Sequence, residues 1–173
     1  MKKLIINAFG PDKPGIVAEI SKIILSFNAN IENSKMILLG SDFTLLMLIS
    51  IDGQKIDEFK NQLNNIIDLE VSFKETLINI NNENKYNKYS FTISVADNEG
   101  IIYLYSDLFK NNYINIEKME TEINNAPISG FPMFTLSSIL NIPLDLDIQT
   151  FKKSLKKIAQ ENNIEYKLEI IKS

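Results

Sequence analysis

Two short turns hold the side chains of this sequence whose types and spacing best suit the binding of a small charged molecule. The first is Gly10–Ile16, where two prolines, two glycines and Asp12 separate an apolar run from a helical apolar periodicity. Pro14 suits the first turn of a helix, and Gly15 lets another group approach its backbone closely. A helix that starts here directs free N–H groups at one spot, which favours a carboxylate or a phosphate. The same residues also suit a strand-to-helix turn that binds nothing.

The second turn repeats the first at a constant distance along the chain. Matching residues recur 85 positions later through a turn, a helix and the start of a strand. Later matches have offsets of 91 and 92, which places a six-residue insertion around residues 124–132 of the second half. Chance seldom maintains such a pattern, so we interpret it as an internal repeat. The pairs at an offset of 85 are Asp12 and Asp97, Gly15 and Gly100, Ile16 and Ile101, Asn30 and Asn115, Ile31 and Ile116, and Glu32 and Glu117.

The elements that must position these turns follow the same order in each half. Apolar runs predict strands at 4–9, 31–39, 43–51 and 69–77, and apolar residues three or four apart predict helices after the first and third strands. This order is that of the split βαβ, ferredoxin-like unit. We predict an α+β protein of two tandem ferredoxin-like (βαββαβ) domains, with antiparallel sheets and helices on one face. The expected boundaries are 1–78, an asparagine-rich linker at 79–87, and 88–173.

The composition argues against several kinds of site and partner. The 173 residues include no cysteine, no histidine and no arginine, which excludes thiol nucleophiles, thiolate metal sites and the usual general base. We expect no catalytic residue, no metal and no cofactor. No apolar run is long enough to span a bilayer, so we expect a cytoplasmic protein with no membrane contact. The net charge of −4 argues against direct nucleic-acid binding, which needs phosphate neutralisation.

The motifs of both halves resemble a known family. A ferredoxin-like unit with Asp-x-Pro-Gly-Ile after its first strand resembles the ACT domain, a small regulatory module that binds amino acids. Residues 126–134, Ala-Pro-Ile-Ser-Gly-Phe-Pro-Met-Phe, resemble a more specific segment of the glycine cleavage system transcriptional repressor family. This resemblance covers almost the whole chain. It implies a regulator that acts through contact with a DNA-binding activator protein, without binding DNA itself.

The resemblance also implies a ligand site. ACT domains bind small amino acids between paired domains, near the loop after the first strand and the start of the second. The ligand carboxylate would meet helix N–H groups, and its ammonium would meet Asp12 or Asp97. The alternative for each aspartate is a helix N-cap or an Asx-turn. The implied ligand-binding residues are Asp12, Pro14, Gly15, Ile16, Asn30 and Ile31 in the first half, and Asp97, Gly100, Ile101, Asn115 and Ile116 in the second.

One difference separates the two implied sites. Glu99 stands at the position of Pro14, so the second turn is less pre-organised and carries a carboxylate that disfavours an anionic ligand group. The second site is therefore either vestigial or part of one shared site. If only one site functions, we place it at the first turn.

Other candidate residues have simpler interpretations. We expect Glu32 and Glu117 to occupy exposed strand positions, and Asp145 and Asp147 to cap a helix. The insertion around residues 124–132 is either a protein contact or a loop packed over its own sheet. Four lysines predict a solvated helix face: Lys152, Lys153, Lys156 and Lys157.

These observations favour a non-enzymatic regulatory protein. We expect it to bind a small, glycine-like amino acid and to act through a protein partner, as a transcriptional repressor of this kind does. Because the edges of small sheets would be exposed in a monomer, we also expect a homo-oligomer such as a dimer. Two alternatives stay open, namely a protein-interaction or oligomerisation module without a ligand, and a regulatory subunit of an amino-acid-metabolism enzyme.

Overall fold

The computed structural model describes residues 1–77, 85–96, 99–125 and 130–171. Contacts between Cα atoms divide the chain into two compact units, Met1–Asn79 and Ile80–Ser173. Most of the expected linker, 79–87, lies outside the described residues, and the first strand of the second unit begins inside it, at Tyr86.

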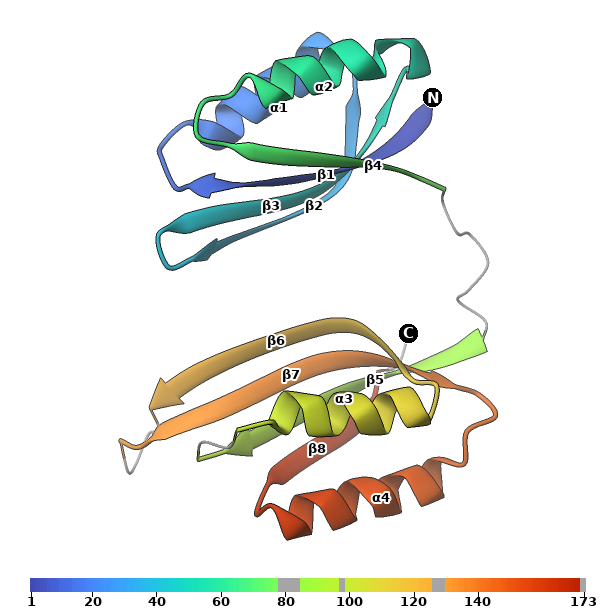
Figure 1. The fold of residues 1–173 in the computed structure, drawn as a ribbon. Coiled ribbons are helices and arrows are strands. Elements are labelled where there is room, and N and C mark those ends of the chain that lie inside the picture. The colour runs from blue at the N-terminus through green and yellow to red at the C-terminus, as the bar shows by residue number, and fades with distance from the viewer. Residues whose placement is uncertain (78–84, 97–98, 126–129, 172–173) are drawn as a thin grey trace. The chain divides into compact units, whose positions relative to one another are not determined.

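The first unit is a four-stranded antiparallel sheet with two helices (Figure 1). Its strands lie in the order β2-β3-β1-β4, so the first and third strands of the sequence are the central ones. A short 3-10 helix, η1, precedes the second helix. The elements are β1 (Lys2–Pro11), α1 (Ile16–Ser26), β2 (Asn30–Leu39), β3 (Asp42–Ile51), η1 (Gly53–Lys55), α2 (Ile56–Asn64) and β4 (Glu70–Thr76).

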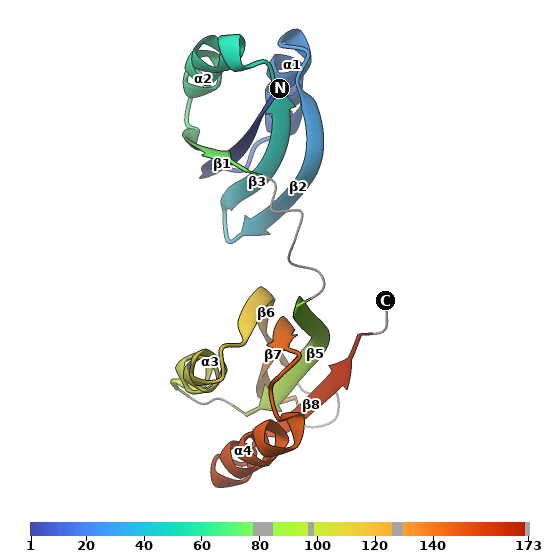
Figure 2. The ribbon, with the colours of Figure 1, turned by 90° about the vertical axis from the view of Figure 1, so that its right-hand side faces the viewer.

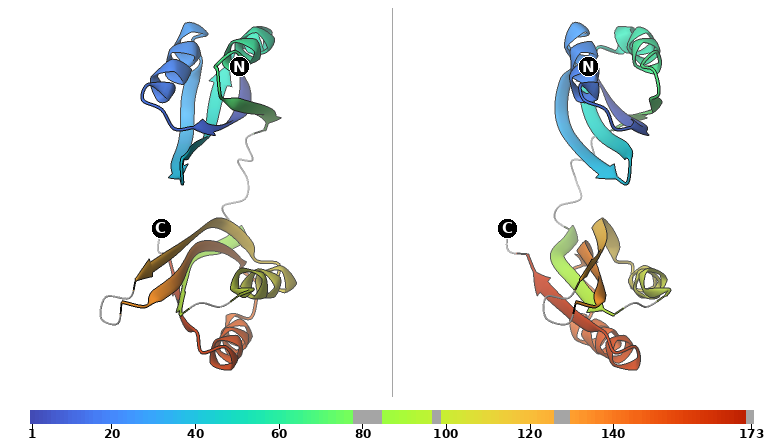
Figure 3. Two further views of the ribbon diagram at one scale, coloured as in Figure 1. Left: turned by 60° about the vertical axis from the view of Figure 1, so that its left-hand side comes forward. Right: turned by 90° about the vertical axis from the view of Figure 1, so that its left-hand side faces the viewer.

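The second unit repeats this architecture, with strands in the order β6-β7-β5-β8. Figures 2 and 3 show the two helices of each unit on one face of its own sheet. The prediction of two tandem βαββαβ domains is confirmed. The elements are β5 (Tyr86–Val95), α3 (Ile101–Asn111), β6 (Asn115–Asn125), β7 (Pro132–Pro143), α4 (Ile148–Glu161) and β8 (Glu165–Ile170).

Each unit has its own core between helices and sheet. Alternate residues of the central strands, such as Leu4, Ile6 and Ala8 of β1, are buried, because successive side chains of a strand point to opposite faces. Phe59 of α2 lies at the centre of the first core, where its ring contacts Phe27 with centroids 5.4 Å apart. The second core is a separate cluster that shares no residue with the first.

The hairpin between β6 and β7 contains the predicted insertion. These strands pair as far as Asn125 with Pro132, and their lengths of 11 and 12 residues exceed the 10 of β2 and of β3. Part of the inserted sequence therefore lengthens the hairpin. Residues 126–129 lie outside the described residues, whereas Phe131 beside them is 70% exposed.

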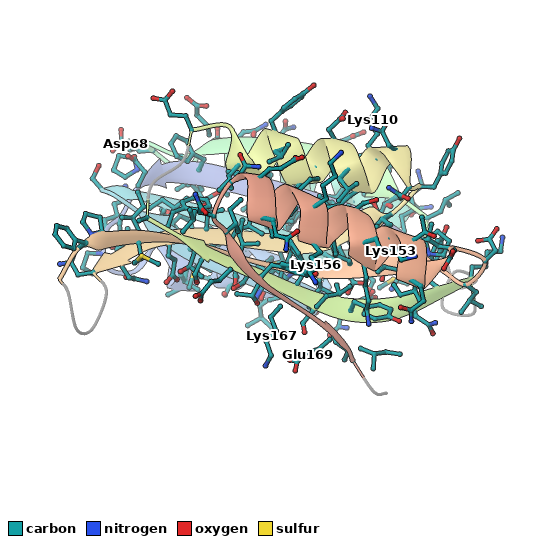
Figure 4. All side chains as sticks on the ribbon, turned by 90° about the horizontal axis from the view of Figure 1, so that it is seen from below. Asp68, Lys110, Lys153, Lys156, Lys167 and Glu169 are labelled. Atoms are coloured by element: carbon teal, nitrogen blue, oxygen red, sulfur yellow. The ribbon has the colours of Figure 1, made fainter. Side chains whose placement is uncertain are left out.

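Helix α4 confirms one capping prediction and corrects another. Asp147 is its N-cap and accepts hydrogen bonds from the N–H groups of Gln149 and Thr150. Asp145 lies in the preceding turn and is not a cap, because α4 starts one residue after Asp147. The lysines of α4 are exposed, as expected for a solvated face, and Figure 4 shows Lys153 and Lys156 on this helix.

Candidate functional site

The first turn starts α1 with a residue in the left-handed conformation. Gly15 is the N-cap and has a φ of +96°, which strains any residue with a Cβ. The helix begins at Ile16, whose side chain is buried in the core. Pro14 precedes the N-cap, so the prediction that it lies in the first helical turn is wrong. Its ring restricts φ in the loop before the helix.

Close backbone approach, expected at Gly15, occurs at Gly10. A Cβ on Gly15 would meet no heavy atom within 4 Å beyond its chain neighbours. A Cβ on Gly10 would lie 2.2 Å from the carbonyl oxygen of Asp68, in the segment before β4. Gly10 therefore allows β1 to pass this segment, while Gly15 is needed for its backbone conformation.

Asp12 lies beside the helix start without capping it. No side chain caps α1, so the N-cap alternative for Asp12 is wrong. Its backbone N–H donates a hydrogen bond to the carbonyl oxygen of Ser41 at 3.1 Å, which ties the turn to the β2–β3 hairpin. Among the described residues, no acceptor receives a hydrogen bond from the N–H of Val17 or Ala18. The helix start therefore retains donors for a ligand.

An open hollow of about 630 Å³ lies at this helix start. Residues 12–18 form one wall, and Met36, Leu38 and Phe43 form the other. Met36 and Leu38 pair with the buried Leu45 and Phe43, so they lie on the helix side of β2. Sequence reasoning missed this apolar wall, although the alternation of side chains along β2 is the signal that could have revealed it.

Lys13 lines the hollow, but its ammonium is held by two residues outside the lining. Its ammonium donates a hydrogen bond to the carbonyl oxygen of Ile67 at 3.1 Å and lies 3.8 Å from a carboxylate oxygen of Asp68. The hollow therefore combines the carboxylate of Asp12, free helix N–H groups and an apolar wall. These groups match the ammonium, carboxylate and side chain of an amino acid.

The structure does not bring all the implied residues of the first half together. Asn30 and Ile31 lie at the start of β2 and pair with Ser50 and Ile49, whereas the hollow adjoins Phe43 at the other end of β3. Seven residues of an extended strand separate these ends, a distance of about 23 Å. Within one domain, Asn30 and Ile31 are therefore too far from the hollow for one small amino acid to contact both.

The second half repeats the helix start in part. Gly100 is the N-cap of α3 with a φ of +81°, no side chain caps the helix, and Ile101 is buried. Asp97 lies outside the described residues. Asn115 and Ile116 begin β6, at the end of the sheet away from this turn, as Asn30 and Ile31 begin β2.

The repeated glutamates lie in matching β-bulges. The register of β2 shifts at Glu32 and that of β6 shifts at Glu117, so each glutamate is an extra residue in its strand. Glu32 forms an ion pair with Lys3, and Glu117 forms one with Lys88 at 2.8 Å. The two lysines also stand 85 positions apart. Interpreting the glutamates as plain exposed strand positions missed these bulges and ion pairs.

Two further kinds of feature are absent from the described part of the chain. This part of the chain has no group of three or more histidine, cysteine, aspartate or glutamate side chains that could hold a metal ion. None of its helices is both long and apolar enough to cross a membrane.

Comparison with known proteins identifies the family. A family model of the ACT domain matches residues 2–74. A UPF0237 protein of Methanococcus maripaludis is 34% identical over 93 residues, which are 54% of this chain and 100% of that protein. The chain belongs to the ACT domain family. Its two ACT domains are the two βαββαβ units described above.

Other proteins are similar to this ACT protein over 97% of its length or more. The glycine cleavage system transcriptional repressor of Escherichia coli is 25% identical over 171 residues, 97% of this chain and 90% of the repressor. The crystal structure of an unknown protein from Galdieria sulphuraria has a TM-score of 0.87 at 24% identity and covers 99% of both chains. A candidate glycine cleavage system transcriptional repressor has a TM-score of 0.71 at 21% identity, over 99% of this chain and 98% of its own. The two crystal structures show the fold.

Proposed function

We propose that this protein is a non-enzymatic regulator that binds a small amino acid at the first turn and acts through a protein partner. The repressor activity named for the Escherichia coli relative supports a repressor-like role. The observation that carries the ligand proposal is the hollow at the start of α1. There the free N–H groups of Val17 and Ala18 lie in one wall with Asp12.

The ligand would lie with its carboxylate at the helix start. Free N–H groups and the positive end of the helix dipole stabilise an anion there. The carboxylate of Asp12 accepts hydrogen bonds from the ligand ammonium, and such charge-assisted bonds are stronger than neutral ones. The side chain of the ligand would contact Met36 and Leu38. The buried side chain of Ile16 restricts that residue to backbone contacts.

The first turn is the stronger of the two candidate sites. Pro14 restricts its loop, and its hollow has free helix N–H groups beside an apolar wall. The second turn has Glu99 in place of the proline, and a carboxylate there repels an anionic ligand group. We therefore assign ligand binding to the first domain.

A thermal-shift panel of the amino acids tests the proposal. An amino acid present at 100 times its dissociation constant stabilises the folded state by about 2.7 kcal/mol. For a domain of this size each kcal/mol raises Tm by about 4–8 °C. The panel includes glycine and serine together with leucine and methionine, which probe the apolar wall. No shift with any amino acid would leave a protein-interaction module without a ligand.

Matched variants locate the site. Asp12→Asn keeps the shape of the side chain, removes its charge and is expected to abolish the shift. Asp145→Asn makes the same chemical change at an exposed residue of the second domain and should retain the shift. An equal shift in both variants would place ligand binding elsewhere.

Regulation through a partner implies that the protein itself does not bind DNA. The chain carries a net charge of −4, and phosphate neutralisation dominates non-specific DNA affinity. Titration with duplex DNA at low salt should therefore give no binding. Binding that weakens steeply as salt is added would contradict the partner mechanism.

A further inference from the structure

A second hollow lies in the second domain, at the end of the sheet opposite its turn. Its volume is about 600 Å³, which is within the range of small-molecule sites. Tyr86 lines it at the start of β5, whereas the turn that holds Gly100 follows the other end of that strand. Neither Asn115 nor Ile116 is among the described residues that line it. The hollow is therefore separate from the ligand-binding residues that the family resemblance implies.

Three segments form this hollow and hold its walls in place. They are the start of β5, the residues after α3 and the loop between β7 and α4. Tyr86 pairs with Pro143 across the sheet. The N–H of Leu144 donates a hydrogen bond to the carbonyl oxygen of Lys85 at 3.4 Å, and the N–H of Tyr113 donates one to the last turn of α3 at 3.0 Å. Backbone contacts therefore fix the positions of the residues that line the hollow.

Tyr113 has a backbone conformation that its side chain does not favour. Each of the helices α1 to α4 is followed, before the next strand, by one residue with a positive φ, and these residues are Asn28, Asp68, Tyr113 and Asn163. Asparagine and aspartate tolerate this conformation, whereas a bulky residue is strained in it. Tyr113 has a φ of +55° and is 87% exposed. Burial therefore does not offset the strain, and uncompensated strain of this kind gathers at functional sites.

The first domain has the same backbone at this place without the aromatic side chains. At the offset of 85, Tyr113 corresponds to Asn28, whose φ is +51°, and Tyr86 corresponds to Met1. A helix end that needs a left-handed residue is served well by asparagine. The tyrosine must therefore have another use, and the pair of tyrosines belongs to the second domain.

The side chains of the hollow suit a cation that carries apolar groups. Tyrosine rings attract cations through their faces, and Asp145 adds an exposed carboxylate. Pro143, Leu144 and Leu146 supply apolar surface, and Leu144 is 58% exposed. A plain ammonium needs hydrogen-bond acceptors for its three N–H groups, whereas an alkylated ammonium contacts aromatic and apolar groups directly. The lining therefore favours the alkylated form.

Lys85 gives the same hollow a charge of the opposite sign. Among the described residues, neither Lys85 nor Asp145 has an ion-pair partner, so the two charges line one hollow without pairing with each other. A ligand with an ammonium alone would be repelled by the lysine. A carboxylate on the same ligand would instead bind the lysine ammonium. The two unpaired charges therefore indicate a zwitterion.

We propose that this hollow binds a small zwitterion of the betaine class, with its alkylated ammonium against Tyr86 and Tyr113 and its carboxylate at Lys85. The carboxylate of Asp145 completes the ammonium subsite. Tyrosine is retained at position 113 because asparagine there would relieve the backbone and remove one of the two rings. This site is independent of the amino-acid site proposed at the first turn.

Three probe molecules of similar shape test the ligand class by calorimetric titration of the full-length protein. Glycine betaine carries both charges, choline carries the cation alone, and dimethylbutanol is the neutral isostere of choline. Replacing the ammonium nitrogen by carbon should weaken binding about tenfold, the loss expected when a cation–π contact is removed. Glycine betaine should bind more tightly than choline, because its carboxylate reaches Lys85. Equal binding of choline and its neutral isostere would overturn the cation site.

Matched tyrosine variants locate the rings. Tyr113→Asn should raise Tm by relieving the backbone, and it should weaken betaine binding about tenfold or more. Tyr103→Asn makes the same change at a tyrosine of α3 that is 75% exposed and does not line the hollow, and it should retain binding. A gain in Tm together with a loss of binding cannot result from unfolding. Unchanged binding by Tyr113→Asn would overturn the site.

A lysine variant tests the zwitterion separately. Lys85→Met should bind choline more tightly and glycine betaine more weakly, because it removes a repulsion from one and a partner from the other. Lys110→Met, at an exposed lysine of α3 outside the hollow, should change neither. A preference for glycine betaine that persists in Lys85→Met would refute the zwitterion. A protein that binds none of the probes would overturn this site and leave the amino-acid proposal, which is tested by its own thermal shifts, unaffected.

Discussion

Two glycines of the first turn serve different physical needs, and substitution separates them. Gly15 adopts a left-handed conformation in open space, whereas Gly10 leaves no room for a Cβ beside the carbonyl of Asp68. The turn therefore depends on backbone conformation at its end and on close packing at its beginning. Both needs are independent of a ligand.

We expect different responses to alanine and asparagine at these glycines. Gly15→Ala should cost about 1–2 kcal/mol of unfolding free energy, and Gly15→Asn should cost less, because asparagine tolerates left-handed backbone. Gly10→Ala should cost about 3 kcal/mol through overpacking, and asparagine should give no relief. Urea unfolding of the four variants measures this. Relief by asparagine at Gly10 would refute the steric explanation.

The buried hydroxyl of Tyr105 is a second residue-scale feature. Its side chain lies wholly within the second core, against the ring of Phe91, and its oxygen has no hydrogen-bond partner in the described structure. Burial raises the pKa of Tyr105 to about 12, since the charged form is poorly solvated there. Tyr105 stands four residues from both Ile101 and Phe109, so all three lie on the buried face of α3.

Removing this hydroxyl should not destabilise the protein. Tyr105→Phe is expected to leave the unfolding free energy unchanged or to raise it by up to about 1 kcal/mol. The raised pKa adds a dependence on pH, because the phenol ionises first in the unfolded chain. Wild-type stability should therefore fall between about pH 10 and pH 12 relative to Tyr105→Phe. A loss of stability in Tyr105→Phe at neutral pH would reveal a partner of the hydroxyl.

At the scale of elements, the starts of α1, α3 and α4 use two different devices. α4 begins at a side-chain cap, whereas α1 and α3 begin after a left-handed glycine, and in α1 the N–H groups of Val17 and Ala18 have no acceptor among the described residues. Hydrogen bonds from Thr150 and Gln149 lower the pKa of Asp147 below its usual value. A capped start has satisfied donors, so it has less to offer a ligand. This difference separates α4 from the candidate site at α1.

The cap of α4 should show in the pH dependence of stability. A lowered pKa means that the charged Asp147 stabilises the folded state above its unfolded pKa of about 3.9, and that this contribution is lost as pH falls further. Asp147→Ala should therefore lower Tm at pH 7, and the deficit should shrink in acid. The neighbouring Asp145→Ala is the control and should leave Tm unchanged. A deficit that does not change with pH would contradict the charge contribution.

At the scale of the whole molecule, the chain is two separately packed ACT domains. The first core includes Phe59, which contacts Phe27 and Phe73, and the second includes Phe91, which contacts Tyr105 and Phe109. The two cores have no residue in common. The two sheets also differ at one edge, because β2 ends in four exposed apolar residues at 36–39, whereas β6 carries Lys118, Glu120 and Glu122.

Core truncations should act within their own domain. Phe59→Ala and Phe91→Ala are each expected to cost about 3–5 kcal/mol, a large share of the stability of a small domain. Hydrogen exchange should rise in β1–β4 for Phe59→Ala and in β5–β8 for Phe91→Ala. Faster exchange in all eight strands from either substitution would show that the domains unfold as one unit.

The sequence by itself determined the two βαββαβ domains and the place of both turns. Strand alternation and helical spacing are local patterns. The repeat at an offset of 85 shows each of these patterns twice, once in each half of the chain. The segment 10–16 was recognisable because prolines restrict φ and glycines permit left-handed backbone, and both favour a turn. Local information therefore sufficed for element type, for order and for most core residues.

The tertiary structure decided which distant residues share a site. Met36 and Leu38 reach the hollow because the register of β2 on β3 places them beside the start of α1. The same register separates Asn30 and Ile31 from Asp12, and a bulge turns Glu32 toward Lys3. The carbonyl oxygen of Asp68 lies so close to Gly10 that this position has no room for a Cβ. These features depend on contacts between segments far apart in the chain, which no local periodicity encodes.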